Sequence, residues 1–172
     1  MSKTVSAYSI LDLLKGEWFL NRKLINVKDQ DFSGSASGTT KLLESSENTL
    51  SYDETVIVNF DNGAEINTTA AYKFQIEENK LHQYIVTQTN TEPKEDHMFE
   101  LAFSATSSQR YAVAAYKCGN DNYSVQYSFS SDNRFSVIYM VSGPHKDYFT
   151  ETEFERILPE EENPKTEIGS EY

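Results

Sequence analysis

Cys118 and Asp121 are the first candidates for chemistry, because a thiol and a carboxyl stand close together at the expected start of a hairpin. A cysteine becomes nucleophilic only when a base or a positive environment stabilises its thiolate. Lys117 is adjacent in sequence but alternates to the opposite face of a strand. We favour a buried small thiol beside an Asx-type turn, and a reactive cysteine is the alternative.

A second polar group follows the Gly143-Pro144 turn, where Lys146, Asp147 and Tyr148 stand in sequence. At the rim of a binding cavity, Lys146 would bind a carboxylate or phosphate, and Tyr148 would form part of the wall. In the alternative, Lys146 and Asp147 cap a hairpin and Tyr148 belongs to the core. The sequence leaves both interpretations open.

The histidines, His82, His97 and His145, are spread along the chain. Alternation puts His97 on one face with Phe99 and His82 on one face with Tyr84, so one or both are candidates for inward-facing positions. The spacing of His, Cys and carboxylate residues matches no zinc or calcium pattern, so we predict no metal site. No nucleophile elbow, nicotinamide fingerprint or phosphate-binding glycine loop indicates a cofactor.

The elements that would position these side chains are β-strands. Apolar and polar residues alternate over 123–130 and over 135–142, which is the period of a half-buried strand. Turn residues occupy 131–133 and 143–144. A third strand over 147–156 places on one face Tyr148, Thr150, Thr152, Phe154 and Arg156.

A short helix precedes the strands. Residues 6–15 carry one apolar stripe, Ser9 and Asp12 suit an N-terminal cap, and Gly16 suits the position after the helix, where a strand begins. Residues 32–40 resemble a flexible Gly/Ser linker, but small residues alternate on the face that runs from Phe32 to Leu42, which favours a strand. Further strands are predicted at 49–60, 67–77, 80–89, 97–104 and 110–118.

About ten strands after one short helix predict an all-β fold, an antiparallel barrel of about 8–10 strands. We expect the barrel to close, because closure removes the exposed edges of so long a meander. The prediction is one barrel domain over residues 6–158. Residues 159–172 are acidic with almost nothing apolar, and we expect a disordered tail there.

Composition limits the partners and the compartment. The chain has 172 residues, a formal net charge of −12 and one cysteine. The negative charge argues against nucleic acid or an anionic membrane as a partner. One cysteine allows no internal disulfide, and no apolar run reaches the length of a membrane span or a signal-peptide core. We therefore expect a soluble, cytoplasmic protein.

Gly16-x-Trp18 after a short helix, together with Arg156 on the final strand, resembles the calycin superfamily of lipocalins and fatty-acid-binding proteins. In lipocalins the corresponding Trp and Arg stack across the closed end of the barrel. The resemblance implies the same contact between Trp18 and Arg156, worth ~0.5–2 kcal/mol. We treat these two residues, with Gly143 and Pro144, as structural.

A second set of motifs runs through nearly the whole chain: Leu14-x-Gly16-x-Trp18 with Arg22 and Ile25, Phe32-x-Gly34-x-Ala36, Leu50-x-Tyr52-x-Glu54, Cys118-x-x-Asp121-x-Tyr123, and Val141-x-Gly143-Pro144-x-Lys146-Asp147-Tyr148 with Thr152 and Arg156. These motifs resemble a calycin-like domain-of-unknown-function family of small bacterial and eukaryotic proteins. The resemblance implies the barrel and no activity. The chain departs from the family pattern at Lys117, where His is usual, and at Phe135 and Val137, where Trp is common.

A barrel of this size can enclose one small ligand. The ligand-binding residues we predict are Arg22, Tyr52, Tyr84, Tyr127, Tyr139, Lys146 and Tyr148. Tyrosine-rich walls suit a flat or amphipathic organic acid better than a bare alkyl chain. The favoured function is therefore binding of a small hydrophobic or aromatic ligand, anionic ones included, and a fully packed interior is the alternative.

Two other functions stay open. An isomerase, cyclase or lyase could hold its substrate in the same interior, and it would need a buried titratable pair such as Asp121 or Glu54 facing a Tyr or His. An interaction module would instead use the acidic outer face or the tail at 158–172. The sequence indicates no oligomeric state.

Overall fold

The computed structural model describes residues 2–159. This part of the chain is mainly β-structure, with one α-helix, α1 (Ala7–Leu14), and a 3-10 helix at Gln30–Phe32. The strands are β1 (Lys3–Thr4), β2 (Gly16–Asn26), β3 (Gly34–Ser46), β4 (Thr49–Phe60), β5 (Glu65–Glu77), β6 (Lys80–Thr87), β7 (Lys94–Leu101), β8 (Ser104–Ala105), β9 (Arg110–Cys118), β10 (Asp121–Ser131), β11 (Arg134–Ser142) and β12 (Asp147–Arg156). The all-β fold with a short N-terminal helix is confirmed. The predicted acidic tail lies outside the described residues from position 160 on.

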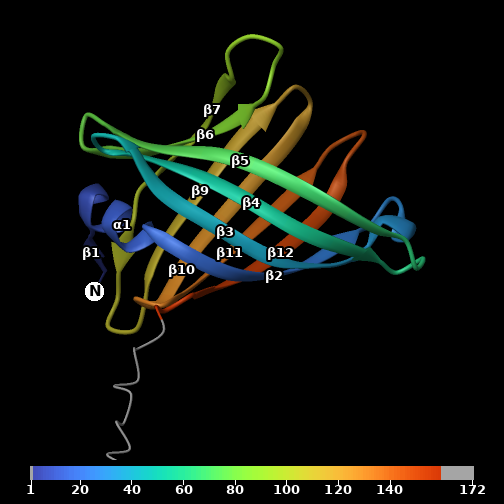
Figure 1. Cartoon of the computed structure of the whole chain (residues 1–172), viewed down its shortest axis with the longest axis horizontal. Helices are drawn as coiled ribbons and strands as arrows, with labels where there is room; N and C mark the ends of the chain where they lie inside the picture. The colour runs from blue at the N-terminus through green and yellow to red at the C-terminus, as the bar shows by residue number, and fades with distance from the viewer. Residues whose placement is uncertain (1, 160–172) are drawn as a thin grey trace, which may run out of the picture.

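All strands belong to one antiparallel sheet in the order β1-β8-β9-β10-β11-β12-β2-β3-β4-β5-β6-β7. Figure 1 shows this sheet curled around a central space. The final strand β12 pairs with β2, which places Arg156 opposite Trp18 and brings the two ends of the fold together. The Gly/Ser-rich segment forms β3, as expected. β1 and β8, of two residues each, were not predicted.

The curled sheet does not close into a complete barrel. β7 and β9 lie beside each other, but no ladder of backbone hydrogen bonds joins them among the described residues. β8 takes the first part of the β9 edge instead, with Ser104 opposite Tyr111. Side chains bridge the rest of this seam, where the rings of Phe99 and Tyr116 lie 5.3 Å apart. The predicted full closure is therefore corrected to a barrel with one open seam.

The antiparallel meander puts its connections at two opposite ends. The helix end carries α1 and the turns at 47–48, 78–79 and 132–133, and the loop end carries the connections at 27–33, 61–64, 88–93, 119–120 and 143–146. α1 buries Ile10, Leu11 and Leu14 against the sheet. Its N-cap is Ser6, whose side chain accepts a hydrogen bond from the Tyr8 amide. The expected cap at Ser9 was therefore wrong, because the helix begins before that residue.

Arg156 joins α1 and Trp18 to the final strand at the helix end. Its guanidinium lies 4.2 Å from the ring of Trp18, which is fully buried. It also donates hydrogen bonds to the carbonyl oxygens of Leu13 and Lys15 at 2.6 and 2.5 Å, at the C-terminus of α1. Gly16 makes this approach feasible, because a Cβ there would lie 2.8 Å from Nη1 of Arg156. The contact implied by the lipocalin resemblance is present.

An aromatic layer packs inside the helix end. The ring of Phe135 stacks on Phe154 at 4.2 Å and meets Trp18 edge-on at 4.7 Å.

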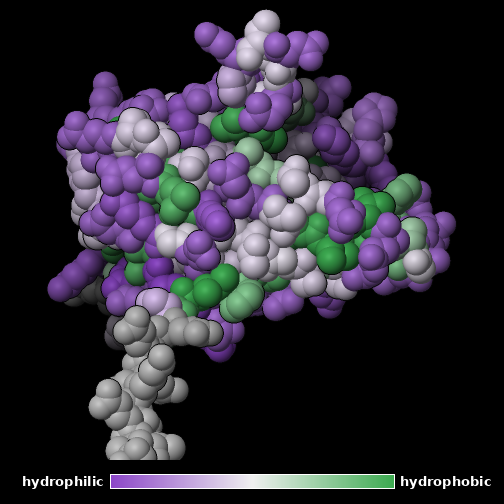
Figure 2. Space-filling model, viewed as in Figure 1, coloured by the Kyte–Doolittle hydropathy of each residue, from purple (hydrophilic) through white to green (hydrophobic). Residues whose placement is uncertain are grey.

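On the face drawn in Figure 2, hydrophobic side chains form separate patches among polar ones. Among residues 2–159, no helix is long and apolar enough to cross a membrane.

Candidate functional site

The barrel interior encloses a cavity of about 790 Å³. Its wall is mostly aliphatic and aromatic, and a smaller set of polar side chains interrupts it. Five of the predicted ligand-binding residues lie on this wall, namely Arg22, Tyr52, Tyr127, Tyr139 and Tyr148. The alternative of a fully packed interior therefore does not hold.

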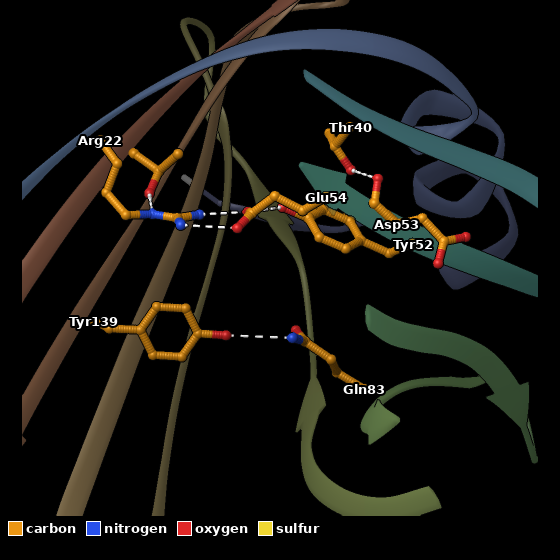
Figure 3. Close-up of polar contacts among 8 residues, drawn as sticks. Arg22, Thr40, Tyr52, Asp53, Glu54, Gln83 and Tyr139 are labelled. Atoms are coloured by element: carbon orange, nitrogen blue, oxygen red, sulfur yellow. Dashed lines mark hydrogen bonds and ion pairs between the residues drawn. The ribbon is translucent and has the colours of Figure 1, made fainter. Parts of the chain in front are cut away.

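Arg22 is at the centre of a buried polar network on one side of the cavity. Its Nη1 and Nη2 donate to the two carboxylate oxygens of Glu54 at 2.9 and 2.6 Å, and its Nε donates to Thr152 Oγ1 at 2.8 Å. Tyr52 donates its hydroxyl proton to Glu54 Oε1 at 2.6 Å. Figure 3 shows the Arg22 and Glu54 side chains pointing toward each other. The carboxylate therefore accepts three hydrogen bonds from protein donors.

The strand register explains why these residues meet. Thr152 on β12 is directly opposite Arg22 on β2. Between β2 and β4 lies β3, which presents Ala36 opposite Arg22, then Gly38, and then Thr40 opposite Glu54. Arg22 can therefore reach across β3 to Glu54. The alternating small residues of β3 leave room for an ion pair that joins strands two positions apart.

Arg22 and Glu54 differ in how far their side chains are exposed. The Glu54 side chain is 3% exposed, whereas that of Arg22 is 22% exposed and borders the cavity. Burial lowers the pKa of Arg22, but its hydrogen bonds and charge interaction with Glu54 outweigh this and raise the pKa above its ordinary value. Burial and the neighbouring Glu54 raise the pKa of Tyr52. The site therefore holds a charged guanidinium, its counter-ion and a neutral phenol.

Gln83 forms a second polar bridge across the cavity. Its Nε2 donates a hydrogen bond to the Tyr139 hydroxyl at 3.2 Å (Figure 3). Its Oε1 accepts a hydrogen bond from Tyr127 at 2.5 Å. Gln83 is 1% exposed and comes from β6, whereas the two tyrosines come from β10 and β11, so the bridge ties opposite walls together. Gln83 was not among the predicted residues, although it shares a face of its strand with Leu81 and Ile85.

Two tyrosine hydroxyls on the wall keep an unused proton. Those of Tyr72 and Tyr116 form no hydrogen bond within residues 2–159, whereas Tyr139 and Tyr148 lie within hydrogen-bonding reach of Tyr127 and Tyr123. Burial raises the pKa of Tyr72 and Tyr116. These two phenols therefore remain protonated near neutral pH and can donate to a ligand.

Lys146 lies at the rim and not on the wall. Its Nζ donates to the Tyr123 hydroxyl at 3.0 Å, and Tyr123 stacks on Tyr116 with ring centroids 4.7 Å apart. The side chain of Lys146 is thus partnered at the cavity mouth, at the rim where the sequence placed it, and its binding of a ligand stays a prediction. Gly143 makes room for Asp121, because a Cβ at Gly143 would lie 1.9 Å from Asp121 Oδ1. The two motifs that carry these residues therefore meet in space.

Cys118 is an exposed free thiol, and it lines the cavity near the loop end. The expectation of a buried thiol was wrong. Cys118 is opposite Asp121 across the β9–β10 turn, whose backbone turns at Gly119. A residue at the end of a strand beside a two-residue turn has too few neighbours to bury it.

Tyr84 lies on the outer face of the barrel, so its predicted place in the cavity was wrong. Its hydroxyl donates to Glu77 Oε1 at 2.8 Å, and Lys73 Nζ lies 4.3 Å from its ring centroid. The inward face of β6 instead carries the alternate residues, Leu81 and Gln83. The misassignment came from taking the aromatic residue rather than its polar neighbour as the inward-facing one.

The two strand histidines also meet on the outer side of β6 and β7. His82 Nδ1 and His97 Nε2 lie 2.9 Å apart, and His97 is exposed although it borders the cavity wall. An irregularity in the β6–β7 register between Gln83 and Tyr84 shifts His97 out of the alternation used in the sequence analysis. Among residues 2–159, no group of three or more His, Cys, Asp or Glu side chains is placed to hold a metal ion.

Residues 14–156 match the model of a family of unknown function, DUF6314. The chain belongs to this family. No curated protein sequence matches it. Its fold is similar to that of an S-type phycobiliprotein lyase, CPES, from Guillardia theta, with a TM-score of 0.56 and 9% identity over 90% of this chain and 94% of that one. A redesigned β-barrel, mFAP0, bound to DFHBI, is also similar, with a TM-score of 0.41 and 15% identity over 84% of this chain and 99% of that one.

Proposed function

We propose that this member of the DUF6314 family binds a small, flat hydrophobic or aromatic molecule inside its barrel. The observation that carries the proposal is the cavity of about 790 Å³, with an apolar and aromatic wall and a few polar groups that point into it. Cavities of roughly 300–1,000 Å³ with such walls are typical of small-molecule sites. Arg22, Tyr72 and Tyr116 supply hydrogen-bond donors that would orient the ligand.

The arrangement of the wall supports a flat ligand. Tyr116 and Tyr123 stack with an angle of 17° between their rings, and together they form an aromatic surface near the loop end. Apolar residues such as Val56 and Val137 line the same cavity. A planar ring system would lie against both aromatic and aliphatic side chains, and its burial would supply most of the affinity. The likeness to the phycobiliprotein lyase supports the fold alone.

The experiment is a fluorescence titration of the chain with two tricyclic probes, 2-acetylanthracene and anthracene-2-carboxylate. Ala70→Trp tests the location, because Ala70 lines the cavity and the larger ring would fill it. Ala71→Trp is the matched control, because the next residue along β5 faces outward. We expect binding of at least one probe, its loss in Ala70→Trp and its retention in Ala71→Trp. Failure of both probes to bind, or equal binding by both variants, would contradict the proposal.

A second candidate is an enzyme of the isomerase, cyclase or lyase type that uses the same cavity. The buried pair of Tyr52 and Glu54, with 2.6 Å between their oxygens, favours it, because such a pair is what that hypothesis requires. Against it, every oxygen of Glu54 already accepts a hydrogen bond, so the carboxylate is placed to hold Arg22.

This candidate can be tested with a small-molecule extract from cells that express the chain. The extract is incubated with the wild-type protein or with Tyr52→Phe, and its components are compared by mass spectrometry. A compound consumed by the wild type and spared by Tyr52→Phe would support an enzyme. An identical composition in both samples would argue for binding alone.

A further inference from the structure

The cavity wall carries no net positive charge, and this limits the charge of a ligand. Arg22 is the wall's only lysine or arginine among the described residues, and Glu54 neutralises it through two hydrogen bonds. The other carboxylate on the wall is Asp96, near the loop end. With His97 neutral, the wall carries +1 from Arg22 and −2 from Glu54 and Asp96, a formal charge of −1.

Two lysines at the rim keep their charge, but their ammonium groups are held by protein oxygens at the mouth and neither residue lines the cavity. Lys146 is held by the Tyr123 hydroxyl, and Lys28 donates to the carbonyl oxygens of Gly143 and Pro144 at 2.8 and 2.6 Å. The chain as a whole carries a formal net charge of −12. Moving an anion from water into a low-dielectric cavity without a free counter-charge is costly. A carboxylate on the ligand would therefore meet an already neutralised guanidinium.

The unused hydrogen-bonding groups of the wall are donors. A guanidinium has five N–H groups, and three of those on Arg22 are taken by Glu54 and Thr152. The hydroxyls of Tyr72 and Tyr116 keep their protons available. The two buried acceptors nearest these donors are already used, since Glu54 and the Gln83 oxygen both accept from protein donors. A complementary ligand therefore brings acceptors and needs few donors.

From this geometry we infer that the ligand is an uncharged aromatic or conjugated molecule that carries carbonyl-type acceptors, such as a ketone, ester or quinone. Its acceptor lies against the free N–H groups of Arg22, or against the Tyr72 hydroxyl, and its ring system lies along the apolar wall. Glu54 then determines specificity without contacting the ligand, because it neutralises Arg22 and so removes the attraction for anions. This inference rests on the proposed function, and it replaces the organic acid expected from the sequence with a neutral acceptor.

Three anthracenes of nearly equal shape test the inference in the wild-type chain at pH 7. 2-Acetylanthracene is neutral and has one acceptor, anthracene-2-carboxylate is its anionic counterpart, and 2-ethylanthracene has no acceptor. We expect the ketone to bind at least about tenfold more tightly than the carboxylate and about fivefold more tightly than the hydrocarbon, in keeping with one or two hydrogen bonds. Affinities are measured by fluorescence titration.

Any other order of the three affinities would overturn one part of the inference. A carboxylate that binds as tightly as the ketone would overturn the neutral-ligand inference and leave the proposed function standing. Equal affinity of 2-ethylanthracene and the ketone would overturn the requirement for an acceptor. Absence of binding by all three probes would overturn the proposed function as well.

Glu54→Gln tests the role assigned to the carboxylate. It leaves Arg22 without a counter-ion, so we expect the affinity for the carboxylate probe relative to the ketone to rise at least about tenfold. Glu155→Gln is the control, because it removes the carboxylate of an exposed Arg134–Glu155 pair outside the cavity, and the wild-type ratio should persist. An unchanged ratio in folded Glu54→Gln would overturn the role of Glu54. Should this variant fail to fold, the ranking by the wild-type chain decides the inference.

Discussion

Replacing Arg156 by methionine tests how the two ends of the barrel are held together. Methionine keeps most of the length and the apolar stem of arginine but removes the guanidinium. That group lies 4.2 Å from the ring of Trp18 and donates to the carbonyl oxygens of Leu13, Lys15 and Asp132. The variant therefore removes one cation–π contact and three backbone hydrogen bonds in a single substitution.

The expected loss follows from these contacts. A guanidinium over a buried indole contributes about 1–2 kcal/mol. Hydrogen bonds from charged donors contribute more than neutral ones, but the three carbonyls near the end of α1 and a turn regain water when Arg156 is lost. We expect Arg156→Met to lower the free energy of unfolding by about 3 kcal/mol. Arg156→Lys should lose about half as much, because lysine keeps the cation and loses the planar fork of donors.

The assay is urea denaturation followed by far-ultraviolet circular dichroism, so that the signal does not depend on Trp18 itself. Arg134→Met is the control, because Arg134 pairs with Glu155 on the surface, where both side chains are more than 60% exposed. That substitution should change the unfolding free energy by less than about 0.5 kcal/mol. A loss of unfolding free energy below about 1 kcal/mol in Arg156→Met would refute the conclusion that this residue holds α1 and Trp18 to the final strand.

Three further results are expected. Gly143→Ala should lower the unfolding free energy by at least about 2 kcal/mol in urea denaturation, because its Cβ would lie 1.9 Å from Asp121 Oδ1, and a variant as stable as the wild type would contradict this packing. Burial raises the pKa of Tyr127 and Tyr139 in the folded chain. The contribution of these two phenols to the unfolding free energy should therefore be fully present below about pH 10 and fall as the pH rises above it. A thermal unfolding midpoint that stays the same from pH 8 to 11 would refute this. Cys118 should react quickly with a thiol reagent such as DTNB, and 2-acetylanthracene at saturation should slow the reaction several-fold, whereas an unchanged rate would place the ligand away from the loop end.

The sequence was sufficient for the parts of the fold that depend on local alternation. The period of two identified the strands around Phe135 and Phe154 and assigned their inward faces correctly, because each residue there follows the pleat without interruption. It failed on β6 and β7, where the register is irregular between Gln83 and Tyr84. The alternation there cannot by itself tell which face is buried, because the strand offers apolar residues to both sides. Tyr84 was therefore assigned to the wrong face.

The open seam could not be derived from the sequence either. Closure was expected because a long antiparallel meander otherwise leaves two exposed edges. In the structure β8 pairs with the start of β9, which prevents a continuous ladder between β7 and β9. A strand of two residues carries too little alternation to be recognised in a sequence. The aromatic contact of Phe99 with Tyr116 covers part of the edge that the missing ladder leaves.

The polar network shows most clearly what a sequence withholds about function. Arg22 was expected among the ligand-binding residues of a cavity that suits an organic acid, and Glu54 was considered as half of a catalytic pair. Their pairing depends on β3 lying between β2 and β4 with the small residues Ala36 and Gly38 facing inward, a relation between three strands that no single segment records. Once Glu54 neutralises Arg22, the same arginine offers hydrogen bonds without net attraction for an anion. The charge of the preferred ligand therefore depends on a residue that does not touch it, which is why the comparison of Glu54→Gln with the wild type is the decisive measurement.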